Sequence, residues 1–537
     1  MDGAGQELTD YLRATAAFRH YPFPEHLEQW AERLLVNRKE IEGFRDLPHL
    51  DSLPLQDMPP APRLDLPKDG GRAPAPARKI ADPTTATAVE IAASVRARLT
   101  SPRDVAEACS ARAAELSYLN AFISFDPDAV RQQADELSDR LKRGQDPGPL
   151  AGVAVAPKDI MYVRGHPYTL GTKALPAPTA DRDAICVART RDAGALIFGT
   201  AHTHELGYGA TGINPHFGRA GNPASARHLA GGSSSGSAAA VAAGIVPLSI
   251  GTDTGGSLRI PASACGAVGF KPTHGLLSRD GVMMVAWSLD DVGTMSANVA
   301  DCALLFEVMA GLPAGCTLPP VPRKPADLKV LRPTNGYFAM AHPEVAARVG
   351  EVIDRLGREG AIVVEREIEH MQWAPLAHFM TLFAEATEAH WPKLMQGQAG
   401  LGLDIRVRLE IGQFFSAVDY VKAQRLRALL RSSMIAAMAD ADAIITPTIA
   451  PLVPEIGSAG NSIQGSAPHS RESAHFSAPY NATGMPAITI PCAIDSRGAP
   501  IGLQIAGRPG DDARVLQVAE ACEKVIEDMG GPRRRST

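Results

Sequence analysis

The chain has 537 residues, of which 45% are hydrophobic and 21% charged, and its formal net charge is −6. This hydrophobic content can bury a large core, which excludes global disorder. The slightly acidic balance argues against sequence-independent nucleic-acid binding, which needs a basic surface. Glycine (49 residues) and proline (43 residues) together make up a larger share of the chain than the roughly 12% that is average for proteins. Because there is no collagen-like period, we expect the glycines to serve local backbone geometry.

The sequence also predicts where the chain resides. Its seven cysteines are dispersed and form no CxxC pair, which is typical of reduced thiols in a cytoplasmic protein. The first residues are polar and acidic and lack the apolar core of a secretory signal. The longest uncharged run, residues 228–252, contains five glycines, five serines and a proline, which argues against membrane insertion. We expect a cytoplasmic protein with no membrane partner.

The N-terminal region has the pattern of a separate helical module. Two short amphipathic helices are predicted within residues 8–44, the first with Leu8, Tyr11, Leu12 and Phe18 on one face. Nine prolines then fall between residues 48 and 83, a density that excludes a helix or a central strand. This stretch is either a disordered spacer or a strap docked along the main domain. The predicted organisation is a helical module (1–47), a proline-rich connector (48–85) and a catalytic domain (86–537).

From about residue 86 an alternating helix and strand pattern begins. Pro102–Leu116 has helical periodicity and follows Ser101, a residue suited to capping a helix. Val153–Ala156 and Ala195–Phe198 are short apolar runs typical of buried strands, and the alternation continues to a last helix at Asp512–Glu527. The pattern predicts an α/β fold with a large mixed, mainly parallel central sheet covered by helices on both faces.

Two serine-bearing glycine loops lie close together in the sequence. Residues 231–236 read GGSSSG and residues 252–257 read TDTGGS. An alanine-rich helix (237–243) and a strand (246–251) are predicted between them, so the fold can bring the two loops side by side. Consecutive backbone N–H groups before Ser257 would form an anion-binding nest. This is the geometry that stabilises an oxyanion during acyl transfer.

A serine nucleophile also needs a base. The stretch Gly232–Gly236 matches G-x-S-x-G, but a nucleophile elbow follows a strand, whereas a polar stretch precedes this one. Lys158 ends an apolar strand, where burial would lower its pKa and let a neutral amine accept a proton. A lysine in that position is also compatible with a purely structural role. The residues alone do not choose among Ser233, Ser234 and Ser235 as its partner.

Several further motifs surround these loops. They are Gly148–Val153 leading into Lys158-Asp159, Asn222-Pro223, Phe270–Thr273, Asn481, Gly484, Pro486 and Gly502–Gln504. Ser233 and Ser257 are 24 residues apart, and Lys158 lies 75 residues before Ser233. Together these features resemble the amidase signature family over residues 86–525. The sequence departs from that family at Ala154, where proline is common, and at Pro157, which constrains the backbone before the lysine without removing it.

The resemblance implies a Ser–cis-Ser–Lys triad with Ser257 as nucleophile, Ser233 after a cis peptide bond as proton relay, and Lys158 as base. It further implies an oxyanion hole from the backbone N–H groups of Thr254, Gly255 and Gly256, supported by Ser234, Asp253 and Arg259. Tyr208, Gly209, Gly232 and Met284 are candidate substrate contacts. No cofactor or metal is implied, because His202 and His204 lack a third ligand, and Gly207–Gly212 matches a dinucleotide motif without the required strand, helix and acid.

The resulting expectation is a homodimeric amidohydrolase that cleaves a small-molecule amide or carbamate through an acyl-enzyme, with side esterase or urethane-cleaving activity. A ureide hydrolase of the 1-carboxybiuret or allophanate type is one alternative, because residues 8–62 weakly resemble the small helical partner subunit of 1-carboxybiuret hydrolase. A protein resembling one component of the tRNA-dependent amidotransferase is another, although the N-terminal extension argues against it. A catalytically inactive scaffold is disfavoured by the intact Lys158, Ser233 and Ser257.

Overall fold

The computed structural model describes residues 9–10, 12–13, 75–312, 318, 323–395, 400–457 and 472–532. The helices of this part of the chain are α3 (Ala88–Arg96), α4 (Pro102–Glu115), α5 (Pro127–Lys142), α6 (Ile185–Asp192), α7 (Ser235–Ala242), α8 (Arg259–Cys265), α9 (Val299–Ala310), α10 (Pro343–Arg358), α11 (Ala374–Met395), α12 (Leu403–Ile411), α13 (Ala417–Ala437), α15 (Ala478–Ala482) and α16 (Asp512–Asp528). The helix predicted after Ser101 is confirmed as α4, and Ser101 and Asp104 form a capping box at its start.

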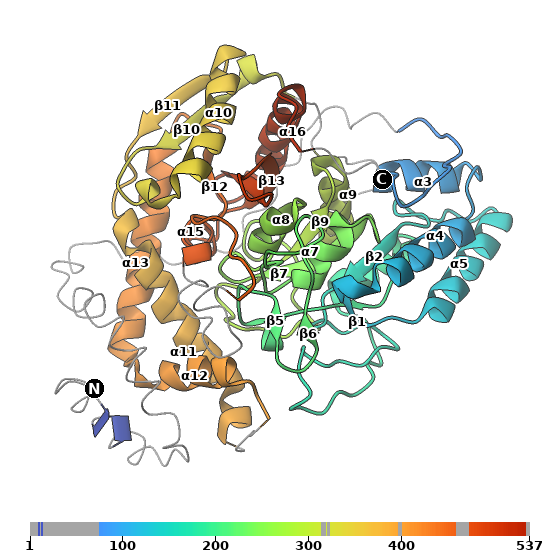
Figure 1. The fold of residues 1–537 in the computed structure, drawn as a ribbon, viewed down its shortest axis with the longest axis horizontal. Helices are drawn as coiled ribbons and strands as arrows, with labels where there is room; N and C mark the ends of the chain where they lie inside the picture. Colours follow the sequence, from blue (N-terminus) through green and yellow to red (C-terminus); the bar gives the residue numbers. More distant parts are fainter. Residues whose placement is uncertain are drawn as a thin grey trace.

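A ten-stranded sheet forms the centre of the molecule (Figure 1). Its strands, in spatial order, are β11 (Ile362–Arg366), β10 (Lys329–Pro333), β12 (Ala443–Pro447), β14 (Pro500–Ala506), β13 (Ala487–Ile494), β8 (Val268–Lys271), β9 (Asp291–Ser296), β7 (Leu248–Asp253), β2 (Ala154–Pro157) and β3 (Leu196–Ile197). Two further two-stranded sheets consist of β1 (Phe122–Ser124) with β4 (Thr200–Ala201) and of β5 (Ile213–Asn214) with β6 (Gly218–Arg219), and β4 bridges to Lys158 directly after β2.

The large mixed α/β sheet is confirmed, but its mainly parallel character is wrong. Of the nine described strand pairings in this sheet, β11–β10–β12 and β7–β2–β3 supply four parallel ones, at the two ends. The five central pairings, from β12 through β14, β13, β8 and β9 to β7, are antiparallel. An alternating pattern of helices and strands predicts parallel pairing only where a helix connects two strands that are neighbours in the sheet. The neighbouring strands β13 and β14 are instead joined by a short turn, which makes them antiparallel.

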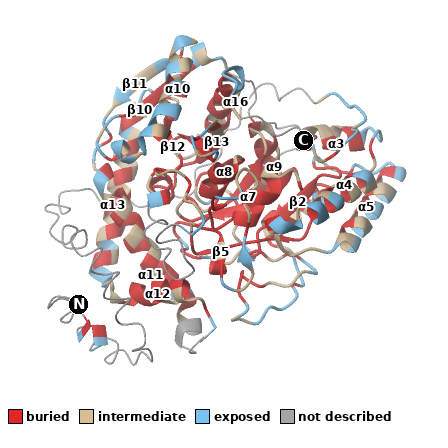
Figure 2. Cartoon of the chain, viewed as in Figure 1, coloured by how far each residue is buried: buried red, intermediate tan, exposed pale blue. Residues whose placement is uncertain are grey.

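Helices cover both faces, as expected. Successive side chains of β10 point to opposite faces of the sheet. Val330 is buried on one face with Val345 and Val349 of α10. Leu331 is buried on the other face with Leu426 and Leu430 of α13. The helices α9, α10 and α16 pack on the first face, and α7, α8, α11 and α13 lie on the other. The short helix α7 is almost wholly buried, and its small side chains let it approach the sheet closely (Figure 2).

The start of the chain contacts helices α11 and α12. Thr9, Asp10, Leu12 and Arg13 are helical, and Leu12 is fully buried with Phe383 of α11 and with Val407 and Ile411 of α12. The rest of the predicted helical module, and the connector as far as residue 74, lie outside the described residues, so the domain boundaries stay predictions. Among the described helices, none combines the length and the apolar character that a membrane crossing requires.

Candidate active site

The site is built where three segments meet beside the sheet. Lys158 directly follows β2, and Ser233 lies in the loop that leads into α7. Ser257 lies in the loop between β7 and α8. Because β2 and β7 are parallel neighbours with Pro157 opposite Ile250, their ends lie at the same edge of the sheet. The lysine and the second glycine loop are therefore brought together by strand pairing.

The side chain of Lys158 reaches the first serine loop. Its Nζ lies 2.7 Å from Ser233 Oγ and 2.7 Å from Thr252 Oγ1, in a hydrogen bond with each. The side chain is completely buried, and this desolvation lowers the pKa of Lys158 to about 7, although Asp290 and Asp253 oppose the shift. A large share of the lysine is therefore neutral near pH 7 and able to accept a proton. Sequence reasoning anticipated the lysine but not Thr252.

The peptide bond between Gly232 and Ser233 is cis, as the resemblance implied. The carbonyl of Ser233 accepts hydrogen bonds from the backbone N–H of His204 and from Thr203 Oγ1, each at 3.1 Å. These contacts attach the serine loop to the segment after β4.

A backbone hydrogen bond joins the two serine loops, because the N–H of Ser234 donates to the carbonyl of Ser257 at 3.0 Å. The hydroxyl of Ser234 donates to the carbonyl of Thr252 at 3.1 Å and accepts from its N–H at 3.3 Å. Ser234 thus connects the two loops, and its supporting role in catalysis stays a prediction. Ser257 itself is half-buried, and its hydroxyl makes no hydrogen bond to any described residue.

The loop before Ser257 contains a glycine in a left-handed conformation and two backbone N–H groups that make no hydrogen bond within the described part of the chain. Gly256 has φ +120°, and a Cβ on this residue would lie 2.1 Å from Ser477 Oγ, so only glycine fits. Its N–H donates to Asp253 Oδ1 at 2.7 Å and is therefore already engaged. The N–H groups of Thr254 and Gly255, the other two predicted oxyanion donors, make no hydrogen bond within the described part of the chain.

Asp253 and Arg259 form a buried ion pair that holds this loop. Arg259 donates from Nε to Asp253 Oδ2 and from Nη2 to Oδ1, both at 2.9 Å. Burial alone would raise the pKa of Asp253, but the Arg259 guanidinium outweighs it and lowers the pKa to about 2. Arg259 also donates to Gln504 and Asn481 at 2.7 Å each and to the carbonyl of Ser477 at 3.0 Å. The two predicted supporting residues thus contact each other directly.

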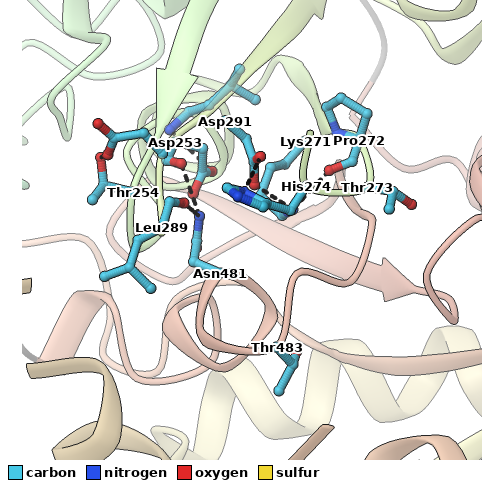
Figure 3. A network of polar contacts seen from close by, with 12 residues as sticks. Asp253, Thr254, Lys271, Pro272, Thr273, His274, Leu289, Asp291, Asn481 and Thr483 are labelled. Carbon is cyan, nitrogen blue, oxygen red and sulfur yellow. Dashed lines mark hydrogen bonds and ion pairs between the residues drawn. The ribbon is translucent and has the colours of Figure 1, made fainter. Parts of the chain in front are cut away.

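Asn481 connects the loop to the C-terminal motifs (Figure 3). Its Nδ2 donates to the carbonyl of Asp253 at 2.9 Å and to that of Leu289 at 3.2 Å. Beside it, Lys271 of the Phe270–Thr273 motif pairs with the buried Asp291 at 2.9 Å. These motif residues therefore form a scaffold under the site.

Asp290 is a buried carboxylate that sequence reasoning did not single out. Its Oδ1 accepts a hydrogen bond from Thr254 Oγ1 at 2.6 Å, and its Oδ2 accepts from the N–H groups of Val285 and Ala286. Burial raises the pKa of Asp290 to about 6. It joins the 285–290 segment to the glycine loop, and no motif in the sequence distinguished it from its acidic neighbour.

The candidate substrate contacts occupy different surroundings. Tyr208 is buried, with its ring in an edge-to-face arrangement with that of Phe383 (centroids 6.2 Å apart) and the Arg408 guanidinium 5.5 Å from its centroid. Gly209 packs against the His204 ring, and Gly232 packs against the Gly209 carbonyl. Met284 is 39% exposed, on the surface of the 282–290 loop. Their contact with a substrate stays a prediction.

The Gly207–Gly212 stretch lies beside Lys158 and the first serine loop. A Cβ on Gly207 would lie 3.7 Å from Lys158 Nζ, and one on Gly212 would lie 2.6 Å from the Gly231 carbonyl. In the described residues, no group of three His, Cys, Asp or Glu is arranged to hold a metal ion. His202 instead lies 3.2 Å from both Ser235 Oγ and the Gly218 carbonyl.

Comparisons with known proteins show the family to which the chain belongs. The chain is 34% identical to a glutamyl-tRNA(Gln) amidotransferase subunit of Roseiflexus sp. (strain RS-1) over 442 residues, which are 76% of this chain and 90% of that protein. It is 34% identical to a fatty acid amide hydrolase of Medicago truncatula over 421 residues, 75% of this chain and 69% of that one. A solved structure described as a vestigial protein complex that reveals the origins of an s-triazine catabolic enzyme superposes with a TM-score of 0.76 at 31% identity, covering 84% of this chain and all of that one. The Amidase family profile matches residues 104–516, and the chain therefore belongs to the amidase family of hydrolases that act on C–N bonds.

Proposed function

We propose that this protein hydrolyses the C–N bond of a small-molecule amide or carbamate, with Ser257 as nucleophile, Ser233 as proton relay and Lys158 as base. The contact that carries the proposal is the 2.7 Å hydrogen bond between Lys158 Nζ and Ser233 Oγ. Because burial lowers the pKa of the lysine to about 7, its neutral amine can accept the proton. A lysine with an ordinary pKa would be protonated at neutral pH and would be a poor base.

The proposed reaction passes through an acyl-enzyme. Lys158 takes the Ser233 hydroxyl proton while Ser233 Oγ takes the proton of Ser257, and Ser257 Oγ bonds to the substrate carbonyl carbon. The N–H groups of Thr254 and Gly255 are assigned to the oxyanion. The C–N bond then breaks as the relay returns a proton to the leaving amine, and water hydrolyses the acyl-enzyme by the same transfers.

In the structure, Ser257 Oγ is not hydrogen-bonded to the relay serine. Catalytic hydrogen bonds are often long or poorly aligned in a free enzyme and tighten in the substrate complex. We therefore propose that the hydrogen bond between Ser257 Oγ and Ser233 Oγ forms when the substrate is bound. The homodimer and the cytoplasmic location stay predictions beside this proposal.

The test compares wild type with Ser257→Ala on aliphatic, aryl, carbamate and ureide substrates and on glutamine. We expect wild type to cleave at least one amide or carbamate and Ser257→Ala to lose nearly all turnover. A fluorophosphonate probe should label wild type at Ser257 and leave the variant unlabelled. Full activity in Ser257→Ala would refute the assignment.

A ureide substrate is the second candidate, favoured by the 31% identity to the s-triazine-related structure over its whole length. Wild-type turnover of a ureide in preference to simple amides would support it. Glutamine hydrolysis that depends on added partner proteins would instead support an amidotransferase role, as the identity to the Roseiflexus protein suggests.

A further inference from the structure

Three side chains from outside the glycine loop hold its carbonyl groups. The carbonyl of Asp253 accepts from Asn481 Nδ2 at 2.9 Å. That of Thr254 accepts from His378 Nε2 at 2.9 Å, and that of Gly255 accepts from Ser477 Oγ at 2.7 Å. Three successive carbonyls are thus all turned toward protein side chains.

This arrangement fixes the direction of the N–H groups. In a trans peptide, the C=O and the N–H of the next residue point to opposite sides of the chain. The peptide between Thr254 and Gly255 is trans, so holding the Thr254 carbonyl on one side directs the Gly255 N–H to the other. A free peptide flanked by glycine could rotate, because glycine adopts many backbone conformations.

His378 is suited to this task by its chemistry and its place. A carbonyl can only accept, so His378 Nε2 carries the proton, and burial lowers the pKa of the ring to about 4, which keeps it neutral. The ring lies directly over the loop, since a Cβ on Gly255 would be 2.7 Å from its Cε1 and Nε2.

The helix that presents His378 is itself anchored near the site. Glu385, two turns further along α11, accepts hydrogen bonds from Ser288 N–H at 2.9 Å and from Ser288 Oγ at 2.6 Å. Tyr420 of α13 donates to the same carboxylate at 2.8 Å. The imidazole is therefore held on a fixed helix and not on a mobile loop, as precise positioning requires.

We propose that His378 is a positioning residue that aims the Gly255 N–H at the oxyanion by holding the Thr254 carbonyl. The inference rests on the proposed function, because it needs an oxyanion at this loop. His378 should therefore stabilise the transition state, in which negative charge develops on the substrate oxygen, and should affect substrate binding little.

The test follows labelling by a fluorophosphonate, in which a P–O bond to Ser257 forms, fluoride leaves and the serine proton passes to the relay. Saturation kinetics separate the maximal labelling rate from probe binding. Loss of a direct oxyanion donor lowers the rate about 10²–10³-fold. His378→Ala keeps the Gly255 N–H but lets it turn away from the oxyanion, so this variant should lower the maximal labelling rate about tenfold to a hundredfold. Binding of the probe should be unchanged. His378→Gln keeps an N–H near the position of Nε2 and should restore most of the rate.

His390→Ala is the matched control, since His390 is also a buried histidine of α11. It should lower the melting temperature as His378→Ala does, but leave the labelling rate at the wild-type value. A wild-type rate in His378→Ala, or a His378→Gln variant as slow as His378→Ala, would overturn the inference. If Ser257→Ala is still labelled at the wild-type rate, the proposed function itself fails. If only His378→Ala behaves as wild type, this inference alone fails.

Discussion

Burying Lys158 costs stability, and Lys158→Met should reveal that cost. The pKa falls from 10.5 to about 7 on folding, so the unfolded chain binds the proton more tightly than the folded protein. The linkage relation gives a destabilisation of about 4 kcal/mol at pH 7, about 2 kcal/mol at pH 9 and below about 1 kcal/mol at pH 10.5. Because the folded-state pKa is lowered, the wild type gains stability as pH rises from about 7 to 10.5.

Methionine has a similar length and cannot be protonated, so it removes this cost. It also removes the hydrogen bonds of Nζ to Ser233 and Thr252, a loss of about 1–3 kcal/mol for buried partners left unpaired. The net expectation is a variant more stable than wild type by about 1–3 kcal/mol at pH 7 and less stable at pH 10.5. The variant should be inactive at both pH values.

The assay is thermal unfolding of wild type and Lys158→Met from pH 7 to pH 10.5, with Lys142→Met as the exposed control. The melting-temperature difference for Lys158→Met should change sign across this range, whereas the control should show no such crossing. In parallel, wild-type kcat/KM should rise with pH through about 7, as the lysine becomes neutral. A pH-independent stability difference, together with a flat activity profile near pH 7, would refute the proposed pKa shift.

Three further changes test the surroundings of the site. Thr252→Val removes a hydrogen bond to the lysine amine, worth about 1.5–3 kcal/mol, and should lower kcat about tenfold to a hundredfold, whereas Thr252→Ser should retain activity. Asp253→Asn leaves the buried Arg259 without its counter-charge and should destabilise the fold by about 3–5 kcal/mol in thermal unfolding; an unchanged melting temperature would contradict the buried pair. Leu12→Ala should lower the free energy of unfolding by about 2–5 kcal/mol, because it leaves a cavity where Leu12 packs against α11 and α12. Asp10→Ala, at an exposed position, should lower it little. Equal effects of the two substitutions would contradict the docking of this segment.

Much of the fold could be predicted from local patterns. Capping and helical periodicity located α4, and the apolar runs located β2 and β3 to within one or two residues. The pairing of strands could not be obtained in this way. The local patterns of β8, β9, β13 and β14 do not fix the direction of their partners, because all four strands are largely buried in the sheet and carry buried polar residues such as Asp291 and Gln504 among the apolar ones. The antiparallel centre is decided by long-range pairing between segments such as 268–271 and 487–489.

The candidate site was predictable where its residues lie in compact motifs. Lys158, Ser233 and Ser257 stand in short segments with distinctive glycine and serine spacing, and the structure brings the lysine to the first serine. The cis peptide bond and the choice of Ser233 over its neighbours came from the resemblance, because adjacent serines are chemically equivalent in a sequence. The engagement of the Gly256 N–H by Asp253 could not be foreseen, since it depends on how the loop turns.

His378 shows why part of such a site is hidden from sequence reasoning. It lies 124 positions after Thr254, on a helix with no glycine or serine signature, and only the packing of α11 over the loop brings the two together. An N–H group is aimed by whatever holds the carbonyl on the other side of its peptide plane, so residues that shape an oxyanion site need not stand near it in the chain. Within one family, the glycine loop can therefore stay the same while the residues that hold its carbonyls change. If His378→Gln restores the labelling rate, the requirement is for a donor at this position and not for histidine.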